Sequence, residues 1–203
     1  MMKIIDCEQR SGTWFALRTG IVTCSHLESV FSKSKGKGRL TYAYKIAAER
    51  LINSTTQYGT SEAMERGILL EPEAREAYEI HSFQNVQQVG FCLDEKLQLG
   101  YSPDGFVGDA GLVEIKTKAP HLQMEVLDKG EVPEEHVAQL QGGLLVTRRH
   151  WIDFVSYCPG LPLFVKRVLP DPKYHESIKE ELVNFYATVS QIVAKVNSKE
   201  VQP

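Results

Sequence analysis

The apolar positions of this chain recur with the period of a helix near both ends and alternate like strands in the middle. From about Asp171 to Val196, apolar residues follow one another at helical spacing, which is typical of a helix that packs by one face. The stripe consists of Tyr174, Ile178, Leu182, Phe185, Val189 and Val193. We therefore expect a long carboxyl-terminal helix whose apolar face covers the core.

Helical patterns also dominate the amino-terminal part of the chain, residues 8–81. The predicted helices lie at residues 11–20, 23–32, 41–53 and 61–81. The last pattern is interrupted at Gly67 and restarts at Glu71 and Pro72, because proline suits the first turn of a helix. A carboxylate at a helix start interacts favourably with the free N–H groups there, so capping is the simplest interpretation of Glu71.

Runs rich in β-branched and aromatic residues predict strands in the second half of the chain. The strands lie at residues 86–93, 97–101, 112–118, 151–158 and 163–169, and a further helix lies at about 133–147. This order predicts an α/β fold of the mixed α+β kind, in which a central mixed sheet is flanked by helices. A chain of 203 residues suits one well-packed core, so we expect a single domain. Its parts are the helical region 8–81, a sheet and helix at 85–169, and the carboxyl-terminal helix at 171–197.

A lone aspartate lies in a proline–glycine turn, ten residues before a glutamate in a predicted strand. Pro103 and Gly105, on either side of Asp104, are strong turn residues. In the strand that follows, alternation places Glu114 and Lys116 on one face. If the turns fold the chain into a hairpin, Asp104 lies beside Glu114. Two carboxylates so close repel each other unless a cation lies between them.

A magnesium ion fits this arrangement, because Mg²⁺ takes oxygen ligands, keeps several waters and binds substrate phosphates. Such a site cleaves phosphodiesters: the metal activates a water, while Lys116 positions the nucleophile or screens the developing negative charge. A second interpretation stays open from these residues alone. A Glu-x-Lys pair in a strand is also typical of a solvated edge, with an ion pair worth under about 1 kcal/mol.

Gln139 stands among apolar residues of the predicted helix at 133–147. A buried amide needs a specific hydrogen-bonding partner. Gly142 and Gly143 follow in the same helix, and each weakens it by up to about 1 kcal/mol. We therefore expect backbone, sheet or DNA to approach the helix closely at these glycines.

The composition narrows the class of protein. A hydrophobic content of 42% and a charged content of 24% are ordinary for a soluble globular protein. The sequence has no apolar run of about 18 residues that would span a membrane, and its first residues are charged too early for a signal peptide. We therefore expect a cytoplasmic protein with no membrane partner. The four cysteines form no C-x-x-C pair and the histidines lack zinc-ligand spacing, so we expect reduced thiols and no structural zinc.

The net charge of −3 is unusual for a nonspecific nucleic-acid binder, since such proteins are generally basic. Any binding to DNA must therefore depend on local clusters of positive charge. One cluster is formed by Lys33, Lys35, Lys37 and Arg39, and another by Arg148 and Arg149 beside Trp151. A solvated loop is the alternative interpretation of either cluster.

Five short motifs occur in order along the chain. They are W-x-x-x-R-x-G-x-x-T-x-S from Trp14, E-x-x-A-R from Glu71, S-P-D-G from Ser102, E-I-K from Glu114, and A-Q-L-Q from Ala138 followed by VTRRHWIDFVSYCP. Each motif alone is weakly specific. The ordered set, over roughly residues 8–196, resembles the lambda-exonuclease type of phage alkaline exonuclease, a YqaJ-like viral recombinase within the PD-(D/E)XK nuclease superfamily.

The resemblance implies a Mg²⁺-dependent exonuclease, for which Mn²⁺ can substitute, that digests one strand of linear double-stranded DNA from its 5′ end. Such an enzyme releases mononucleotides and leaves a 3′ overhang for a single-strand annealing recombination protein. The resemblance also implies a ring-shaped homotrimer around the duplex, encoded by a phage or prophage and acting in the cytoplasm of a bacterial host. A closed ring needs positive potential only on its inner wall, which accommodates the net negative charge.

The resemblance also assigns roles to residues, motif by motif. The metal ligands it implies are Asp104, Glu114 and the Ile115 carbonyl. The other catalytic residues it implies are Lys116, with Glu71 and Gln139 as a supporting acid and amide. The residues it implies for the DNA end are Arg18, Ser25 and Ser102 around the 5′-terminal phosphate, and Met64 near the position of an apolar wedge between the strands.

Two alternatives accompany this assignment. One is a sequence-specific or nicking endonuclease of the same superfamily, and the other is a catalytically inactive protein that binds DNA ends in recombination. The chain has no additional segment long enough for a recognition subdomain, and no residue of the expected site is missing. Both observations favour the exonuclease.

Overall fold

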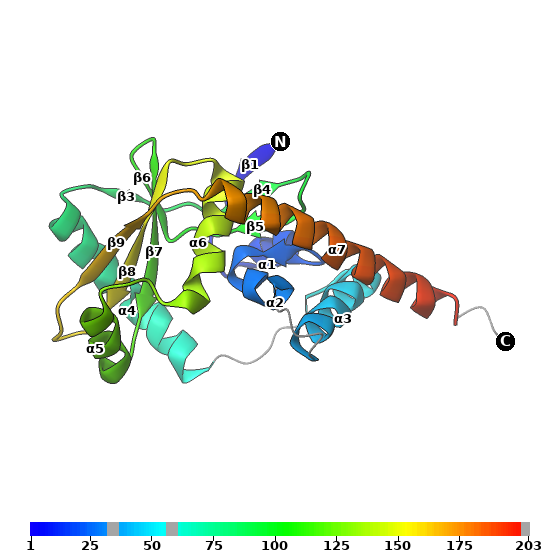
Figure 1. Ribbon diagram of the computed structural model, residues 1–203, viewed down its shortest axis with the longest axis horizontal. Coiled ribbons are helices and arrows are strands. Elements are labelled where there is room, and N and C mark those ends of the chain that lie inside the picture. Colours follow the sequence, from blue (N-terminus) through cyan, green and yellow to red (C-terminus); the bar gives the residue numbers. More distant parts are fainter. Residues whose placement is uncertain (32–36, 56–60, 200–203) are drawn as a thin grey trace.

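The strands β7 (Gly111–Thr117) and β8 (Trp151–Tyr157) lie side by side at the centre of the larger of two sheets. Their β-branched and aromatic residues are buried along most of both strands, and this requires apolar cover on both faces. The two strands are parallel, with Glu114 opposite Phe154. The computed structural model in Figure 1 describes residues 1–31, 37–55 and 61–199.

The larger sheet has five strands. Their order is β3 (Val86–Gln87), β6 (Gly105–Val107), β7, β8 and β9 (Phe164–Val168). The β7–β8 pair is parallel and the other pairs are antiparallel. This sheet is therefore mixed, as the order of predicted elements indicated.

A smaller sheet stands beside it, so the expected single central sheet is divided into two. Its order is β1 (Met2–Ile5), β4 (Phe91–Asp94), β5 (Leu99–Tyr101) and β2 (Val22–Thr23). The strand predicted at residues 86–93 is broken, because β3 joins the larger sheet and β4 the smaller one. Between them, a Cβ on Gly90 would lie 2.4 Å from the carbonyl oxygen of Cys7, so this residue must be a glycine where the two backbones cross.

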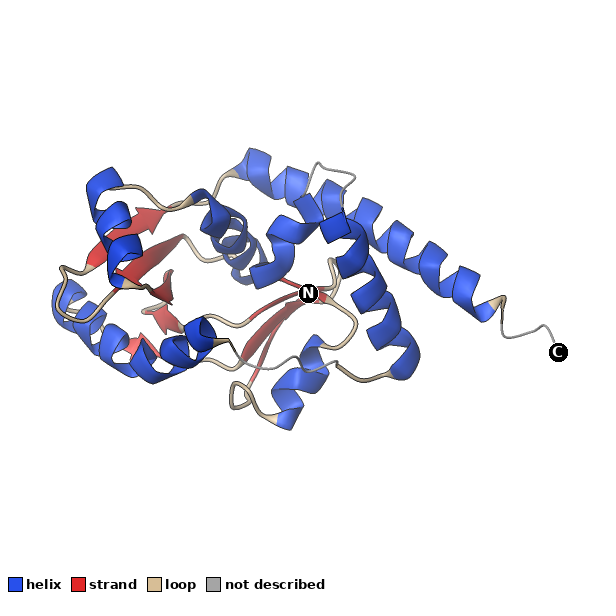
Figure 2. Cartoon of the chain, turned by 90° about the horizontal axis from the view of Figure 1, so that it is seen from below, coloured by secondary structure: helices blue, strands red, loops and turns tan. Residues whose placement is uncertain are grey.

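Helices surround both sheets (Figures 1 and 2). They are α1 (Gly12–Arg18), the 3-10 helix η1 (Cys24–His26), α2 (Leu27–Phe31), α3 (Lys37–Ile52), α4 (Glu62–Ser82), α5 (Pro120–Lys129), α6 (Glu134–Thr147) and α7 (Pro172–Asn197). No helix in the described ranges is long and apolar enough to cross a lipid bilayer.

The two faces of the central strands are covered by different helices. Val113 and Ile115 of β7 pack with Tyr78 of α4 in one apolar cluster. Leu112 of β7 packs with Leu140 of α6 in the other. Because successive side chains of a strand point to opposite faces, the even-numbered residues of β7 face α6.

Helix α4 runs without a break from Glu62 to Ser82, which contradicts the predicted interruption at Gly67. Pro72 lies inside the helix, where it removes one backbone hydrogen bond at a cost of roughly 3 kcal/mol. The buried contacts of Ala74 and Tyr78 in the next turn hold the helix together across this position. Glu71 is therefore in mid-helix, and its interpretation as a helix-start cap is wrong.

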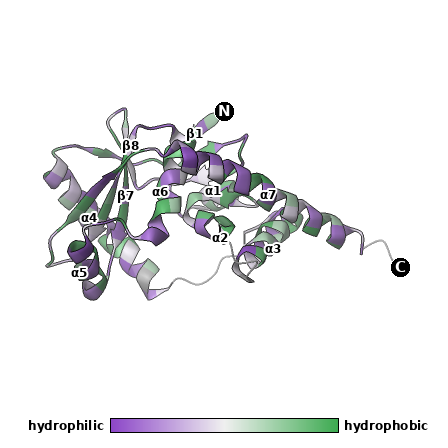
Figure 3. Ribbon diagram, in the orientation of Figure 1, coloured by the Kyte–Doolittle hydropathy of each residue, from purple (hydrophilic) through white to green (hydrophobic). Residues whose placement is uncertain are grey.

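The carboxyl-terminal helix α7 has the predicted bounds within one or two residues. Asp171 caps it, because its carboxylate accepts hydrogen bonds from the backbone N–H groups of Lys173 and Tyr174 at 2.9 and 3.2 Å. The stripe is buried at Ile178, Leu182, Phe185 and Val189, and Figure 3 shows hydrophobic and hydrophilic residues interleaved along the helix. The prediction that its apolar face covers the core is confirmed.

Helix α5 was not predicted. Pro120 occupies its first turn and Gly130 ends it with a φ of 63°. This order, proline first and glycine last, is the usual asymmetry of helix ends, so the signal was present. The helix was missed because it is only ten residues long and shows no continuous apolar stripe.

Candidate active site

Strand β6, which follows the turn at Asp104, forms the expected hairpin with the central strand β7. Strands β6 and β7 pair antiparallel with Gly105 opposite Val113, which brings Asp104 beside Glu114. Oδ2 of Asp104 accepts a hydrogen bond of 2.6 Å from the backbone N–H of Ile115. The hairpin therefore fixes the first carboxylate against the strand that carries the second.

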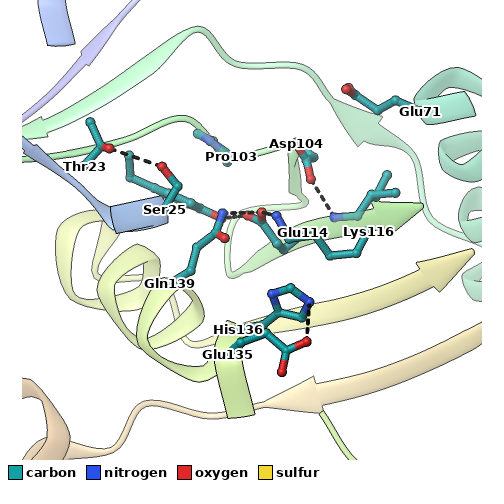
Figure 4. A network of polar contacts seen from close by, with 12 residues as sticks. Thr23, Ser25, Glu71, Pro103, Asp104, Glu114, Lys116, Glu135, His136 and Gln139 are labelled. Atoms are coloured by element: carbon teal, nitrogen blue, oxygen red, sulfur yellow. Dashed lines mark hydrogen bonds and ion pairs between the residues drawn. The ribbon is translucent and has the colours of Figure 1, made fainter. Parts of the chain in front are cut away.

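Glu114 is buried, with 2% of its surface exposed. Its Oε1 accepts hydrogen bonds from Lys116 Nζ, at 2.8 Å, and from the Gln139 side-chain amide of α6 (Figure 4). Its Oε2 accepts a hydrogen bond of 2.8 Å from the hydroxyl of Tyr101. Three donors from three elements thus hold one carboxylate, and the strand alternation predicted for Glu114 and Lys116 is present.

The charges in this cluster influence one another. Burial, and next the negative charge of Glu114, raises the pKa of Asp104 well above its usual range, although Lys116 opposes this. Burial alone would lower the pKa of Lys116, but the carboxylates of Glu114 and Asp104 outweigh it, so that the pKa is raised. Lys116 therefore remains an ammonium ion, and its charge does not offset the effects that raise the pKa of Asp104.

These residues fit a hard divalent cation. Two carboxylates in close proximity, one of them with a strongly raised pKa, are stabilised as anions when a cation binds between them. Across the described ranges, no group of three or more acidic, histidine or cysteine side chains forms a closed cage. A pair of carboxylates with open positions suits Mg²⁺, which retains waters and binds substrate phosphate oxygens.

Tyr101 was not identified from the sequence as a site residue. It is buried at the end of β5, directly before the motif that contains Asp104. Burial, and next the negative charge of Glu114, raises the pKa of Tyr101 well above its ordinary value, so the hydroxyl stays protonated and donates. The only signal in the sequence is an aromatic residue just before the turn, and this does not reveal its partner.

The close approach expected at the two glycines of α6 is confirmed. A Cβ on Gly143 would lie 2.8 Å from the ring of Tyr101, and one on Gly142 would lie 2.3 Å from Cδ1 of Leu27. The neighbours are therefore side chains of β5 and α2. Gly143 leaves the space that lets the Tyr101 hydroxyl reach Glu114.

A groove of about 370 Å³ opens at the end of β7. Its walls are formed by Ile115, Lys116 and Thr117 of β7, by Met64, Gly67, Ile68 and Glu71 of α4, and by Arg10. The groove thus brings Met64, 57% exposed, into the neighbourhood of Lys116. Its lining thus combines apolar side chains, Met64 and Ile68 among them, with the charged Lys116, Glu71 and Arg10.

Glu71 does not contact the other two carboxylates and lies apart from them in Figure 4. It is paired instead with Arg75 at 2.5 Å, on its own helix, and with Arg10 at 3.4 Å. The cause is the fold, since α4 covers the odd-numbered face of β7 whereas Glu114 faces α6. Glu71 therefore reaches the site only where the groove passes the end of the strand.

A second polar cluster lies on the amino-terminal helices. The Arg18 guanidinium lies over the Trp14 ring at 4.0 Å, and both side chains donate to the hydroxyl of Ser102, at 3.3 Å from Arg18 Nη1 and 2.8 Å from Trp14 Nε1. Ser102 begins the motif that contains Asp104, so this cluster is directly attached to the carboxylate pair. Ser25, which is exposed, is hydrogen-bonded instead to Thr23 at 3.2 Å.

Two of the basic residues noted in the sequence, Arg39 and Arg149, are held by partners outside the groove. Lys33 and Lys35 lie outside the described residues, and Arg39 is paired with Glu181 at 2.6 Å. Arg149 donates to the backbone carbonyls of Gly108 and Gly111, at 2.7 and 2.9 Å, so its role is structural. The positive charges that line the groove are those of Lys116 and Arg10.

Comparisons with known proteins show what this chain is similar to in sequence and in fold. The family model of the YqaJ-like viral recombinase domain matches residues 13–150. An alkaline exonuclease from Laribacter hongkongensis, LHK-Exo, has a similar crystal structure with a TM-score of 0.85 at 33% identity, over 94% of this chain and 98% of that chain. The structure of LHK-Exo in complex with dAMP gives a TM-score of 0.86 at the same identity and coverage. A phage-related exonuclease from Haemophilus somnus 129PT shares the fold, with a TM-score of 0.67 at 14% identity over 89% of this chain and 98% of that chain. No curated protein sequence gives a significant match.

Proposed function

This chain belongs to the family of YqaJ-like viral recombinase domains and is a DNA nuclease, and on that premise we propose that it degrades linear double-stranded DNA from its 5′ ends. One strand is digested to mononucleotides, and the 3′ overhang that remains is the substrate of a single-strand annealing recombination protein. The observation that carries the proposal is the buried Glu114, held by three donors beside Asp104, on the strand whose Ile115 and Lys116 line an open groove.

The residues of the site have different roles in hydrolysis. Asp104, Glu114 and the Ile115 carbonyl would hold Mg²⁺, or Mn²⁺ in its place. When bound, the metal supplies a polarised water and neutralises charge on the phosphate. Lys116 remains charged and stabilises the negative charge that develops on the phosphate oxygens.

Other residues support this centre by fixing the ligands. Gln139 and Tyr101 hold the two oxygens of Glu114, and such outer partners orient a ligand and tune it. Glu71 lies at the groove, between two arginines. It supports the site through the charge it places beside Lys116.

The preference for a 5′-phosphate rests on the cluster beside Asp104. The Arg18 guanidinium and the Ser102 hydroxyl are within 3.3 Å of each other, and a guanidinium with hydroxyl donors suits a terminal phosphate dianion. Ser25 adds a further donor to the 5′-phosphate if its hydroxyl turns from Thr23 to the phosphate. Met64, which lines the groove of Lys116, acts as the apolar wedge that separates the strands.

The proposal extends to the assembly and its location. We infer that three copies form a ring around the duplex in the cytoplasm of a bacterial host, because enclosure retains DNA on a protein whose net charge is −3. Native mass spectrometry tests this, and a trimer is the expected species. A monomer at micromolar concentration would contradict the ring.

The experiment that tests the function compares DNA ends. Linear duplexes with 5′-phosphate or 5′-hydroxyl ends, and a closed circle of the same sequence, are incubated with Mg²⁺ or with EDTA. We expect rapid release of mononucleotides from the 5′-phosphorylated duplex with Mg²⁺ alone. Cleavage of the circle at the same rate would indicate an endonuclease, and activity in EDTA would refute the metal site.

A further inference from the structure

Arg10 occupies a backbone conformation that normally requires glycine. Its φ is 69°, in the left-handed region that side chains other than glycine, asparagine and aspartate rarely adopt. The neighbouring Gln9 anchors the segment, since its amide donates to the carbonyls of Val89 and Pro103 at 3.1 and 3.0 Å. Pro103 directly precedes Asp104, so this anchor fixes Arg10 relative to the catalytic turn.

The Arg10 guanidinium stands where two grooves meet. Together with Glu71 it lines both the groove of about 370 Å³ that contains Lys116 and a second groove of about 500 Å³. The second groove carries Asp6 and Glu8, which disfavour a phosphate. A DNA strand that lies along the first groove, beside Lys116, therefore passes Arg10 at its boundary.

The ion pair of Arg10 is loose. Its Nη2 lies 3.4 Å from Oε2 of Glu71, and 48% of its side chain is exposed. Glu71 already has a closer partner in Arg75, at 2.5 Å from Oε1. Two guanidinium groups thus share one carboxylate, and an exposed ion pair of this length contributes little, so Arg10 can exchange Glu71 for another anion while Arg75 keeps it.

We propose that Arg10 binds a backbone phosphate of the DNA strand next to the phosphodiester that is cleaved, and that it leaves Glu71 to do so. The guanidinium fork suits a phosphate oxygen pair, which it binds with two hydrogen bonds. This inference rests on the proposed function, because it needs DNA in the groove. It assigns Arg10 to substrate binding, and the chemistry of cleavage stays with the residues around Glu114.

The test is the salt dependence of DNA binding in EDTA, where no cleavage interferes. Binding of a fluorescent 5′-phosphorylated duplex is followed by anisotropy over a series of NaCl concentrations. Arg10→Gly removes the guanidinium and suits the positive φ, so its unfolding midpoint should not fall. We expect the slope of log K against log salt to decrease by about one, with a several-fold loss of affinity. Arg10→Lys keeps the charge and should retain the slope.

Arg148→Gly is a matched control. Arg148 also has a positive φ, of 57°, and a side chain that is 68% exposed. It lies at the carboxyl end of α6 and does not line the groove that contains Lys116. This variant should bind DNA with the slope of the unchanged protein. An unchanged slope for Arg10→Gly, or an equal decrease for Arg148→Gly, overturns the inference about Arg10.

The two proposals fail in different ways. If the unchanged protein does not degrade the linear 5′-phosphorylated duplex with Mg²⁺, the proposed function is wrong. If it degrades this DNA and Arg10→Gly shows no change of slope, only the role of Arg10 is wrong.

Discussion

The hydroxyl of Tyr101 donates a hydrogen bond of 2.8 Å to Oε2 of Glu114, and neither residue is more than 2% exposed. Lys116 and Gln139 donate to the other oxygen of the same carboxylate. Glu114 is therefore held from both sides before any substrate or cation arrives. A carboxylate oriented in this way would lose little freedom on binding the proposed Mg²⁺.

Tyr101→Phe tests this contact. The change leaves one oxygen of a buried carboxylate without its donor, which should cost about 1–3 kcal/mol of unfolding free energy and lower kcat. Denaturant unfolding and steady-state digestion of linear DNA measure the two effects. Tyr44→Phe, at a tyrosine that is 55% exposed, is the control and should leave both unchanged.

Gly143→Ala tests the space that Tyr101 needs. The added Cβ would lie 2.8 Å from the ring, so the ring or α6 must move, at a cost of about 1–3 kcal/mol for overpacking. We expect lower stability and lower activity together. At Gly38 of α3 nothing lies within 4 Å of an added Cβ, so Gly38→Ala should stabilise the protein slightly. If Gly143→Ala kept full activity, the position of the Tyr101 ring would not matter for catalysis.

Lys116→Ala should abolish cleavage and spare end binding. The ammonium lies 2.8 Å from Glu114, where it can stabilise charge in the transition state, so its loss should lower kcat by roughly 100-fold or more. Binding of a 5′-phosphorylated duplex in EDTA should weaken far less. Lys129→Ala, at a lysine whose side chain is 64% exposed, controls for the loss of one charge. Unchanged cleavage would remove Lys116 from the mechanism.

The lowered pKa of His26 predicts that the protein loses stability in acid. Burial, followed by the positive charges of Lys45 and Arg18, lowers the pKa of His26 from 6.5 to about 4. The unfolded chain therefore binds a proton at a higher pH than the folded chain. Above pH 6.5 His26 is neutral in both states and does not destabilise the fold. As the pH falls from 6.5 to about 4, the free energy of unfolding decreases by roughly 3 kcal/mol at most. Urea unfolding at a series of pH values measures it.

The variant His26→Asn isolates this histidine from other acid-sensitive groups. Its unfolding free energy should depend less on pH than that of the unchanged protein between pH 6.5 and 4. His81→Asn, at an exposed histidine, should follow the unchanged protein. Identical pH dependence in all three proteins would contradict the prediction.

The hairpin of β6 and β7 could be predicted from the sequence because its determinants are local. The turn at Gly108, with its positive φ, closes the hairpin, and alternation along seven residues of β7 decides which face Glu114 and Lys116 share. Helix α7 could be predicted for the same reason, because its apolar stripe is a pattern within one element that extends over many turns. Patterns within one element are readable without knowledge of its neighbours.

The parts that could not be predicted depend on neighbours distant in the chain. Tyr101 gains its role from Glu114 and from the space left by Gly143, and no pattern at residue 101 encodes either. Glu71 was placed at a helix start because proline normally favours that position, whereas the packing of Tyr78 carries α4 through it. The division into two sheets likewise depends on the crossing of Gly90 with Cys7.

The parallel pairing of β7 with β8 also sets the order in which the site can assemble during folding. Asp104 and Glu114 meet within one short hairpin, whose closure costs little chain entropy. The parallel partner β8 follows only after a crossover that contains α5 and α6, and Gln139 lies on α6 within that crossover. Such distant contacts form slowly. A refolding chain should therefore recover its two carboxylates first and regain activity later, when α6 docks and Gln139 reaches Glu114.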